Sequence, residues 1–362
     1  MMMKIKARNF LFYLTAFVSI TQSLFAEDFR RAWKEDSDPS NFDASYVKNF
    51  YSLPREGTVK HFPWTSTFFP SSLGGIAYRP QTEETPFRYR SPSREEVMKM
   101  SLAERERLSP AEKYDIWLGR FDYPTVYYEL GRTTPKDPDW AGLCHGWAPS
   151  AINFHEPRDV TLVSKDGIEV PFTSYDIKAY LSYYQGEHGE NEAKFLGIRC
   201  NGSGRGISKF RPSCRGVNAG AFHVAVTNEI GIRKKSFVFD RDPSYQVWNQ
   251  PAVSYTYKIV KEKKGRFIGS AKGTKKRVFI KMSLIYTDEV GDSDWAALSS
   301  RGLKNVDTIS YYYRLELDKH GQILGGKWKS SMRPDFLWQQ DRPTFSGYYG
   351  DIETIYRASL KQ

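Results

Sequence analysis

Cysteine is scarce in this chain, with Cys144, Cys200 and Cys214 as the only three among 362 residues. Their spacing relative to histidines and carboxylates matches no zinc site, and none follows the N-terminal apolar run closely enough for lipid attachment. No nucleic-acid-binding motif is present, and no segment beyond that run is apolar for the roughly 20 residues that a membrane-spanning helix needs. These absences argue against a zinc protein, a lipid-anchored protein, a nucleic-acid-binding protein and a membrane-spanning one.

The N-terminus has the features of a secretory signal peptide. Three basic residues within the first eight positions precede an apolar run over 10–20, and the segment ends in the small residue Ala26. The apolar run is too short to span a bilayer. We therefore expect residues 1–26 to be a signal peptide and the mature protein to be secreted or periplasmic.

The composition is that of a folded, basic protein. It is 40% hydrophobic and 15% aromatic, enough for a sizeable core in one or two domains. The formal net charge is +11, and loss of the three basic charges of residues 1–26 would leave +8. In an exported protein this charge suits an anionic cell-wall or envelope surface, or it serves solubility alone.

The cysteines divide into a pair and a single residue. Cys200 and Cys214 flank a glycine-rich polar loop, and their pairing would close a loop of about 15 residues and contribute roughly 3 kcal/mol. We therefore predict a disulfide between them, which leaves Cys144 as an unpaired and reactive thiol in an oxidising compartment.

The chain after the signal peptide begins with an irregular segment. Residues 27–92 are rich in proline, serine, arginine and aromatic residues and have no long periodic stretch. We expect them to wrap the rest of the protein as ordered irregular structure, or to act as a pro-like segment, with the catalytic domain over 93–362.

Helix signals follow in series. Serines at 93, 101 and 109 each have a glutamate three residues later, which predicts capping boxes and short helices beginning at those positions. A further helix is predicted over 175–184 from its apolar spacing.

Cys144 lies in a segment rich in glycine and tryptophan, just before an apolar pattern at helical spacing. The first turn of a helix has unpaired N–H groups and a positive dipole end, which favour a thiolate. This pattern predicts a nucleophile, and the alternative is a buried structural cysteine. His145 is adjacent and would point about 100° away on a helix, so we do not expect it to be the base.

A base and its partner are predicted from a hairpin. Residues 222–227 and 236–240 both alternate like strands, and a two-residue turn at Gly231 would place His223 opposite Asp240. Directly opposed residues have Cβ atoms about 5 Å apart, so the carboxylate would hold the imidazole. The predicted catalytic set is therefore Cys144, His223 and Asp240, with His223 as base and Asp240 fixing its orientation.

Several motifs together resemble the transglutaminase elicitor family, which includes oomycete cell-wall transglutaminases and bacterial relatives. They are the segments at 139–148, 221–223 and, above all, Val247-Trp248-Asn249-Gln250-Pro251. The resemblance covers roughly residues 90–340. It implies a papain-like or transglutaminase-like cysteine-enzyme fold and protein–glutamine γ-glutamyltransferase activity, with Cys144 as nucleophile. The segment after Gln250 departs from the plant-recognised peptide of the oomycete proteins.

The fold class expected is α+β, with the cysteine at a helix N-terminus packed against a mainly antiparallel sheet. Long strands are predicted over 255–260, 276–286 and 308–317 from their β-branched and aromatic residues. The acidic loop 288–294 lacks EF-hand spacing, so a solvated turn is favoured over calcium binding, and no cofactor is certain.

The expected reaction is attack of Cys144 on a glutamine carboxamide, followed by transfer to a lysine amine or to water. Protein or peptide glutamine donors and amine acceptors would be the partners. The alternatives are a papain-like peptidase or amidase acting on cell-wall peptides, and a non-enzymatic cell-wall-binding module. Trp140 is the candidate second donor to the oxyanion, since its indole is donor-only, or else it packs under the loop.

Overall fold

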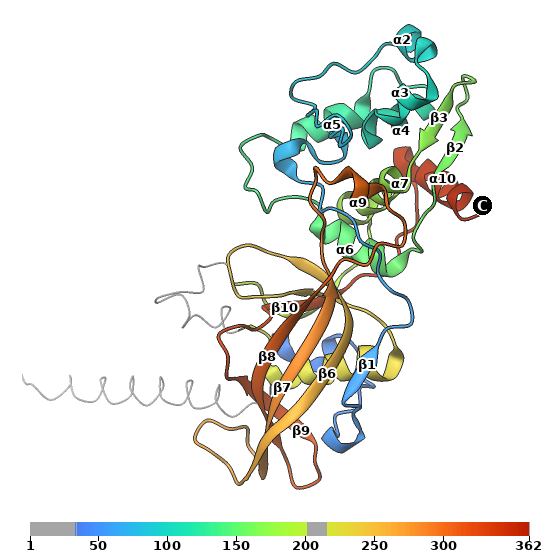
Figure 1. Ribbon diagram of the computed structural model, residues 1–362. Coiled ribbons are helices and arrows are strands. Elements are labelled where there is room, and N and C mark those ends of the chain that lie inside the picture. The colour runs from blue at the N-terminus through green and yellow to red at the C-terminus, as the bar shows by residue number, and fades with distance from the viewer. Residues whose placement is uncertain (1–32, 34, 201–215, 362) are drawn as a thin grey trace, which may run out of the picture.

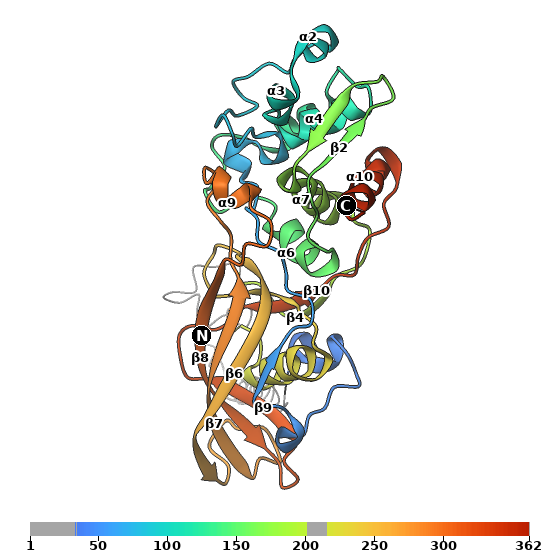
Figure 2. The same cartoon turned by 45° about the vertical axis from the view of Figure 1, so that its right-hand side comes forward.

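The computed structural model describes residues 33, 35–200 and 216–361. They form two lobes stacked along one long axis, with a helical lobe above and a sheet-based lobe below (Figure 1). Helix α6, Cys144–Asn153, lies where the two lobes meet, and a view turned by 45° shows the same position (Figure 2). Helices and antiparallel strands are thus largely segregated, as in the α+β class.

The helical lobe is an assembly of short helices and one hairpin. The hairpin pairs β2 (Val160–Val163) with β3 (Glu169–Phe172) in antiparallel register. The α-helices of the described chain are α2 (Arg94–Lys99), α3 (Leu102–Glu106), α4 (Pro110–Trp117), α5 (Pro124–Arg132), α6, α7 (Ser174–Tyr183), α8 (Ala219–Val226), α9 (Trp295–Ser299) and α10 (Ile352–Ser359). Helix α8 belongs to the lower lobe, and the others belong to the upper lobe or its junction.

The lower lobe is built on one antiparallel sheet in the order β4-β10-β5-β6-β7-β8-β9, with β1 also pairing with β6. The strands are β1 (Glu56–Thr58), β4 (Lys194–Gly197), β5 (Val238–Asp240), β6 (Asn249–Lys264), β7 (Lys276–Thr287), β8 (Val306–Leu317), β9 (Ile323–Trp328) and β10 (Phe336–Gln339); the separate hairpin strands are β2 (Val160–Val163) and β3 (Glu169–Phe172).

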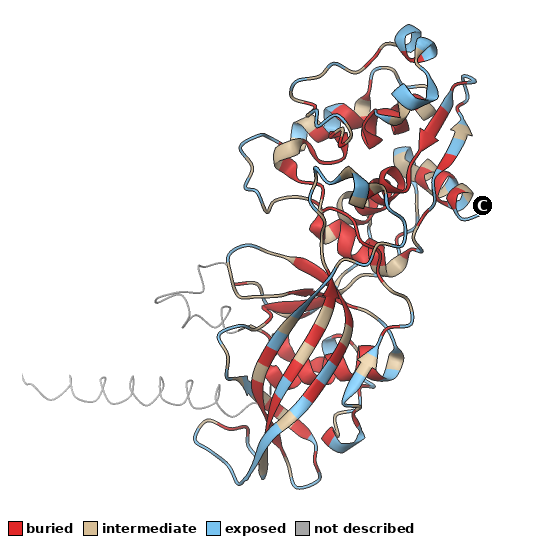
Figure 3. Ribbon diagram, in the orientation of Figure 1, coloured by how far each residue is buried: buried red, intermediate tan, exposed pale blue. Residues whose placement is uncertain are grey.

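Each lobe has its own hydrophobic core (Figure 3). The upper core gathers α4, α6 and α7 around fully buried residues such as Trp147 and Tyr180. The lower core lies between the sheet and α8, where Phe222 packs edge-on against Tyr311 and Tyr313. The two cores account for the stability of two lobes joined through α6 and the sheet end beside it.

The helix predictions based on capping boxes are confirmed. Ser93, Ser101 and Ser109 cap α2, α3 and α4, and each glutamate three residues later closes the box. Helix α7, Ser174–Tyr183, covers all but the last residue of the stretch predicted over 175–184, and it begins after the cap residue Thr173. These elements could be read from local sequence because their caps satisfy backbone N–H groups within four residues.

The three long predicted strands are also confirmed, and they lie within β6, β7 and β8. The predicted hairpin between 222–227 and 236–240 is wrong. Residues Ala219–Val226 form α8, which Asn218 caps through its side chain, and β5 pairs with β6 and β10 instead. Every residue of α8 is buried, so the helix has no polar face and its sequence lacks the 3.6-residue period.

The N-terminal irregular segment contributes to both cores. Phe42, Tyr46 and Phe50 pack in the lower core, whereas Trp64 and Phe69 pack in the upper one. Strand β1 joins this segment to the sheet through β6. Its role as a removable pro-like segment, and the boundary at residue 92, remain predictions.

Two sequence predictions fall on residues outside the described part. The signal peptide, 1–26, lies there, and so does Cys214 of the predicted disulfide. Cys200 itself is fully buried, and the free cysteine of the described chain is Cys144. Across the described residues, no helix combines the length and apolarity needed to cross a membrane.

Candidate functional site

Cys144 is the first residue of α6, directly after the cap residue Leu143. The loop before it is held in place by the backbone N–H of Leu143, which donates to the carbonyl of Phe68 at 2.6 Å. The cysteine is 7% exposed, at the end of the helix where backbone N–H groups are free of helical partners. This position favours negative charge on the sulfur.

The amide of Asn249 faces the thiol from the start of β6. Its Nδ2 lies 3.4 Å from the Cys144 sulfur, which is also 3.7 Å from the carbonyl oxygen of Val247. The indole Nε1 of Trp338, on β10, donates to Asn249 Oδ1 at 2.9 Å. Since that bond uses the amide oxygen, it turns the NH₂ group of Asn249 toward the sulfur.

His145 faces a carboxylate rather than open solvent alone. Its Nε2 lies 3.4 Å from Glu187 Oε1, and Glu187 is also 3.7 Å from Arg132. Glu187 belongs to a π-helical turn, Tyr184–His188, that continues α7. The side chain of His145 is 43% exposed, so a substrate can reach it while Glu187 holds it in place.

Close packing of α6 on α7 produces this contact. A Cβ atom on Gly146 would lie 2.0 Å from the backbone oxygen of Ser182, and one on Gly186 would lie 3.0 Å from the His145 Nε2. Glycine at both positions therefore lets the start of α6 and the π-helical turn approach to backbone contact. The approach brings the imidazole of His145 to the carboxylate of Glu187, while His145 also interacts with the thiol of Cys144.

The thiol and the imidazole shift each other's pKa. Burial opposes the thiolate, but hydrogen bonding and charge attraction from His145, helped by Asn249, outweigh it and lower the pKa of Cys144. Burial likewise opposes the imidazolium, yet the interactions with Cys144 and Glu187 raise the pKa of His145 to about 9. Each group therefore stabilises the charged form of the other, the thiolate of Cys144 and the imidazolium of His145.

His223 is not brought to this site. It is fully buried in α8, and its Nδ1 lies 2.8 Å from the hydroxyl of Tyr313 in the lower core. Burial alone lowers its pKa to about 3, so it is neutral at pH 7. In the described structure, no hydrogen bond joins it to Cys144 or to Asp240, which corrects the predicted His223–Asp240 pair.

Asp240 lies close to the thiol but faces no histidine. It ends β5 opposite Asn249, and its Oδ1 accepts the backbone N–H of Trp248 at 3.1 Å. Burial, with smaller contributions from nearby acidic groups that include Cys144, raises the pKa of Asp240 to about 9. It is therefore a neutral carboxylic acid at pH 7 rather than the anionic partner of an imidazolium.

Trp140 packs against an aromatic neighbour. Its ring meets that of Tyr245 edge to face, with centroids 6.0 Å apart. The indole of Trp140 makes no hydrogen bond within the described part of the chain, and the donor beside the sulfur is Asn249. The arrangement fits the packing alternative for Trp140.

A pocket of about 280 Å³ opens beside these groups. His145 and Asn249 line it, together with Phe195, which is stacked on Trp338. The pocket presents an imidazole, an amide and aromatic surface, a combination suited to a side chain that ends in a carboxamide.

The acidic loop 288–294 uses its carboxylates internally. Asp288 and Glu289 both accept hydrogen bonds from the Gln250 amide, at 3.2 and 2.7 Å, and Asp294 caps α9. Within the described residues, no group of three or more histidine, cysteine, aspartate or glutamate side chains is arranged to hold a metal ion.

Sequence reasoning missed three residues of this site: His145, Glu187 and Asn249. The sequence offered one signal, because Asn249 lies in the Trp-Asn-Gln-Pro motif that carried the family resemblance. Ideal helix geometry predicts that His145 points away from Cys144, but in the structure His145 interacts with both Cys144 and Glu187.

Comparison with known proteins identifies the family. Residues 133–348 match the transglutaminase elicitor family. The solved structures include a similar one, the GP42 transglutaminase from Phytophthora sojae, with a TM-score of 0.64, 20% sequence identity, and coverage of 90% of this chain and 97% of that chain. No curated protein sequence matches. Because the family match spans more than half of the sequence and includes Cys144 and Asn249, the chain belongs to the transglutaminase elicitor family.

Proposed function

We propose that the protein is a protein–glutamine γ-glutamyltransferase in which Cys144 is the nucleophile. The observation that carries the proposal is the thiol of Cys144 at a helix start, with its pKa lowered by His145. His145 is in turn held by Glu187 at 3.4 Å. Covalent acyl transfer requires a nucleophile, a base in contact with it, and a third group that orients the base.

The first half of the reaction forms a thioester. The thiolate attacks the carbonyl carbon of a glutamine side chain, and the developing oxyanion is stabilised by Asn249 Nδ2 and a backbone N–H at the start of α6. The carbon–nitrogen bond then breaks, and the imidazolium of His145 gives its proton to the departing ammonia. His145 is left neutral.

The second half releases the product. Neutral His145 takes a proton from an incoming lysine amine, which attacks the thioester and displaces the thiolate, so an isopeptide bond forms. If water enters instead, the product is glutamate. In this proposal His145 and Glu187 take the roles first assigned to His223 and Asp240, and Asp240 is a neutral neighbour of the thiol.

The papain-like description belongs to the same proposal. A cysteine helix, α6, packs against the start of the antiparallel strand β6, and Asn249 of that strand contacts the sulfur. Secretion or a periplasmic location, the Cys200–Cys214 disulfide, and contact with an anionic envelope surface are proposed from sequence alone.

The test uses purified protein, a glutamine-rich protein donor and a labelled primary amine. We expect covalent incorporation of the amine and release of ammonia, both lost in Cys144→Ala. Cleavage of peptide bonds without incorporation would overturn the proposal in favour of a peptidase. No turnover, together with a Cys144 thiol unreactive toward iodoacetamide at neutral pH, would overturn it in favour of a binding module.

A further inference from the structure

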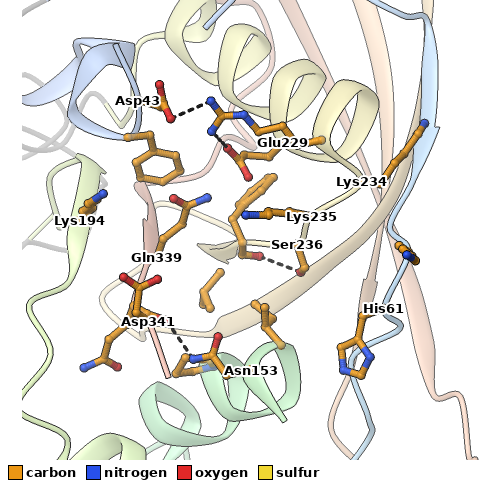
Figure 4. Close-up of a pocket in the computed structure, with 18 of the residues that line it drawn as sticks. Asp43, His61, Asn153, Lys194, Glu229, Lys234, Lys235, Ser236, Gln339 and Asp341 are labelled. Carbon is orange, nitrogen blue, oxygen red and sulfur yellow. Dashed lines mark hydrogen bonds and ion pairs between the residues drawn. The ribbon is translucent and has the colours of Figure 1, made fainter. Parts of the chain in front are cut away.

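A second pocket lies at the other end of the cysteine-bearing helix. It measures about 780 Å³, and the C-terminal half of α6 forms one wall through Pro149, Ile152 and Asn153. Strands β5 and β10 contribute other walls, and Figure 4 shows Lys194 and Lys235 on opposite sides with Gln339 between them. The volume falls in the range of about 300–1,000 Å³ typical of ligand sites.

The charge of this second pocket is positive. Its lining includes five basic and three acidic side chains, in the order Asp43, Lys60, Lys194, Glu229, Arg233, Lys234, Lys235 and Asp341. Arg233 is held by Asp43 at 2.7 Å and by Glu229 at 3.0 Å, so these three groups together leave one excess negative charge. None of the four lysines forms an ion pair within the described chain. Asp341 and the excess negative charge beside Arg233 oppose them, which leaves the lining with two net positive charges.

This charge selects the sign of the ligand. The four lysines of the lining are exposed, and two of them, Lys194 and Lys235, flank the pocket on opposite sides. They attract carboxylates and repel another amine. A protonated lysine, the acceptor in the proposed reaction, is therefore a poor occupant. An acidic peptide segment is a suitable one, and the amides of Asn153 and Gln339 add neutral hydrogen-bonding groups.

The second pocket adjoins the pocket beside Cys144. Gln340 lines both, and Asn153 Nδ2 donates to its backbone oxygen at 3.0 Å. Gln185, which lines the first pocket, donates to Gln340 Oε1 at 2.8 Å. At a rise of about 1.5 Å per residue, Asn153 is about 13 Å along α6 from Cys144. An extended peptide covers that span with about four residues.

We propose that the second pocket binds an acidic segment of the glutamine donor. It selects donors with carboxylate side chains about three to five residues from the reactive glutamine. The inference rests on the proposed function for the glutamine itself, whereas recognition of the acidic segment rests on the lysines and the cavity alone.

The test is a binding measurement on the full chain carrying Cys144→Ala. The probes are fluorescent peptides with one glutamine and with aspartates three to five positions to its N-terminal or C-terminal side, each matched by a peptide with asparagines instead. One of the two aspartate peptides is expected to bind about 5-fold more tightly than its asparagine match, a size appropriate to partly exposed ion pairs, and added salt should reduce the difference. In the active protein the same peptide should have the higher kcat/KM for amine incorporation.

Lysine variants locate the effect. Lys194→Gln with Lys235→Gln should remove the preference for aspartate, while Lys258→Gln with Lys281→Gln, exposed on β6 and β7, should leave it unchanged. Equal binding of aspartate and asparagine peptides overturns the inference, as does loss of the preference in the control variant. If amine incorporation fails while the lysine-dependent preference persists, the proposed reaction is wrong and the acidic-segment site stands.

Discussion

The Nε2 atom of His145 lies 3.4 Å from the Oε1 atom of Glu187, across the contact between α6 and the π-helical turn that ends α7. The contact fixes the imidazole next to the thiol of its own neighbour in sequence, Cys144. It makes His145 the histidine whose pKa responds to the thiol, and it leads directly to two predictions.

The choice of base is tested by two histidine variants. His145→Ala should lower kcat about 10²–10⁴-fold, the usual contribution of a general acid–base, with little loss of stability because the ring is 43% exposed. His223→Ala removes a fully buried ring and its bond to Tyr313, so it should lower the melting temperature while the folded protein keeps its turnover. Turnover and thermal unfolding measured on both variants show which histidine acts as the base. A folded but inactive His223→Ala protein beside an active His145→Ala protein would restore the original assignment.

The role of Glu187 is tested by the pH profile of kcat/KM. Because the pKa of His145 is raised to about 9, its imidazolium persists up to that pH and is lost above it. Activity should therefore fall on the alkaline side near pH 9. Glu187→Gln removes the negative charge that helps hold the proton, so the alkaline limb should move to lower pH. If Glu187 were only structural, kcat/KM would change without any movement of the limb.

Oxyanion stabilisation is tested by comparing Asn249 with Trp140. Asn249→Ala removes the Nδ2 group 3.4 Å from the sulfur and should lower kcat about 10²–10³-fold with the fold intact. Trp140→Phe keeps the packing against Tyr245 and should leave turnover near normal. Steady-state kinetics and melting temperatures of the two variants provide the comparison. A larger loss of turnover in Trp140→Phe than in Asn249→Ala would show that the indole of Trp140 stabilises the oxyanion.

Asp240 should make the stability of the protein depend on pH in a definite direction. Its pKa is raised from 3.8 to about 9 by burial, so the folded state holds a proton that the unfolded state has released. Stability should then fall as pH rises from about 4 to 9, by at most about 1.4 kcal/mol per pH unit for this group. Asp240→Asn replaces the neutral acid by an amide of the same shape and should flatten that dependence.

Denaturant unfolding of the wild type and Asp240→Asn at pH 5 and pH 8 checks this prediction. The variant should also retain most of its turnover, since the acid is neutral at working pH. Strong loss of turnover in a well-folded Asp240→Asn protein would give the carboxyl a direct role beside Cys144.

Elements fixed by local chemistry were predictable from the sequence. The capping boxes at Ser93, Ser101 and Ser109 predict their helices because the cap residue and its glutamate partner lie within four residues of each other. The runs of β-branched and aromatic residues predict β6, β7 and β8, because these residue types favour strands through their local conformation and packing. Cys144 was singled out by the same kind of evidence, and the family followed from short motifs around it.

Elements decided by burial were not predictable. Helix α8 is buried between the sheet and the N-terminal segment, so it has apolar residues on every face. Its sequence therefore lacks a helical period of hydrophobicity and resembles the alternation of a strand. The misassigned hairpin then carried His223 to the wrong place. The wrong pairing of His223 with Asp240 thus began as an error in one buried helix.

By itself the sequence determined the capped helices, the long strands and the family, and it singled out Cys144 as the candidate nucleophile. Tertiary structure alone decided which groups surround Cys144, because Asn249 reaches Cys144, and Glu187 reaches His145, through contacts between distant elements. Glycines 146 and 186 permit the close packing of α6 on the π-helical turn, and the bond from Trp338 orients the amide of Asn249. Such contacts depend on how whole helices and strands pack against one another. The spacing of residues along the chain does not predict these distances.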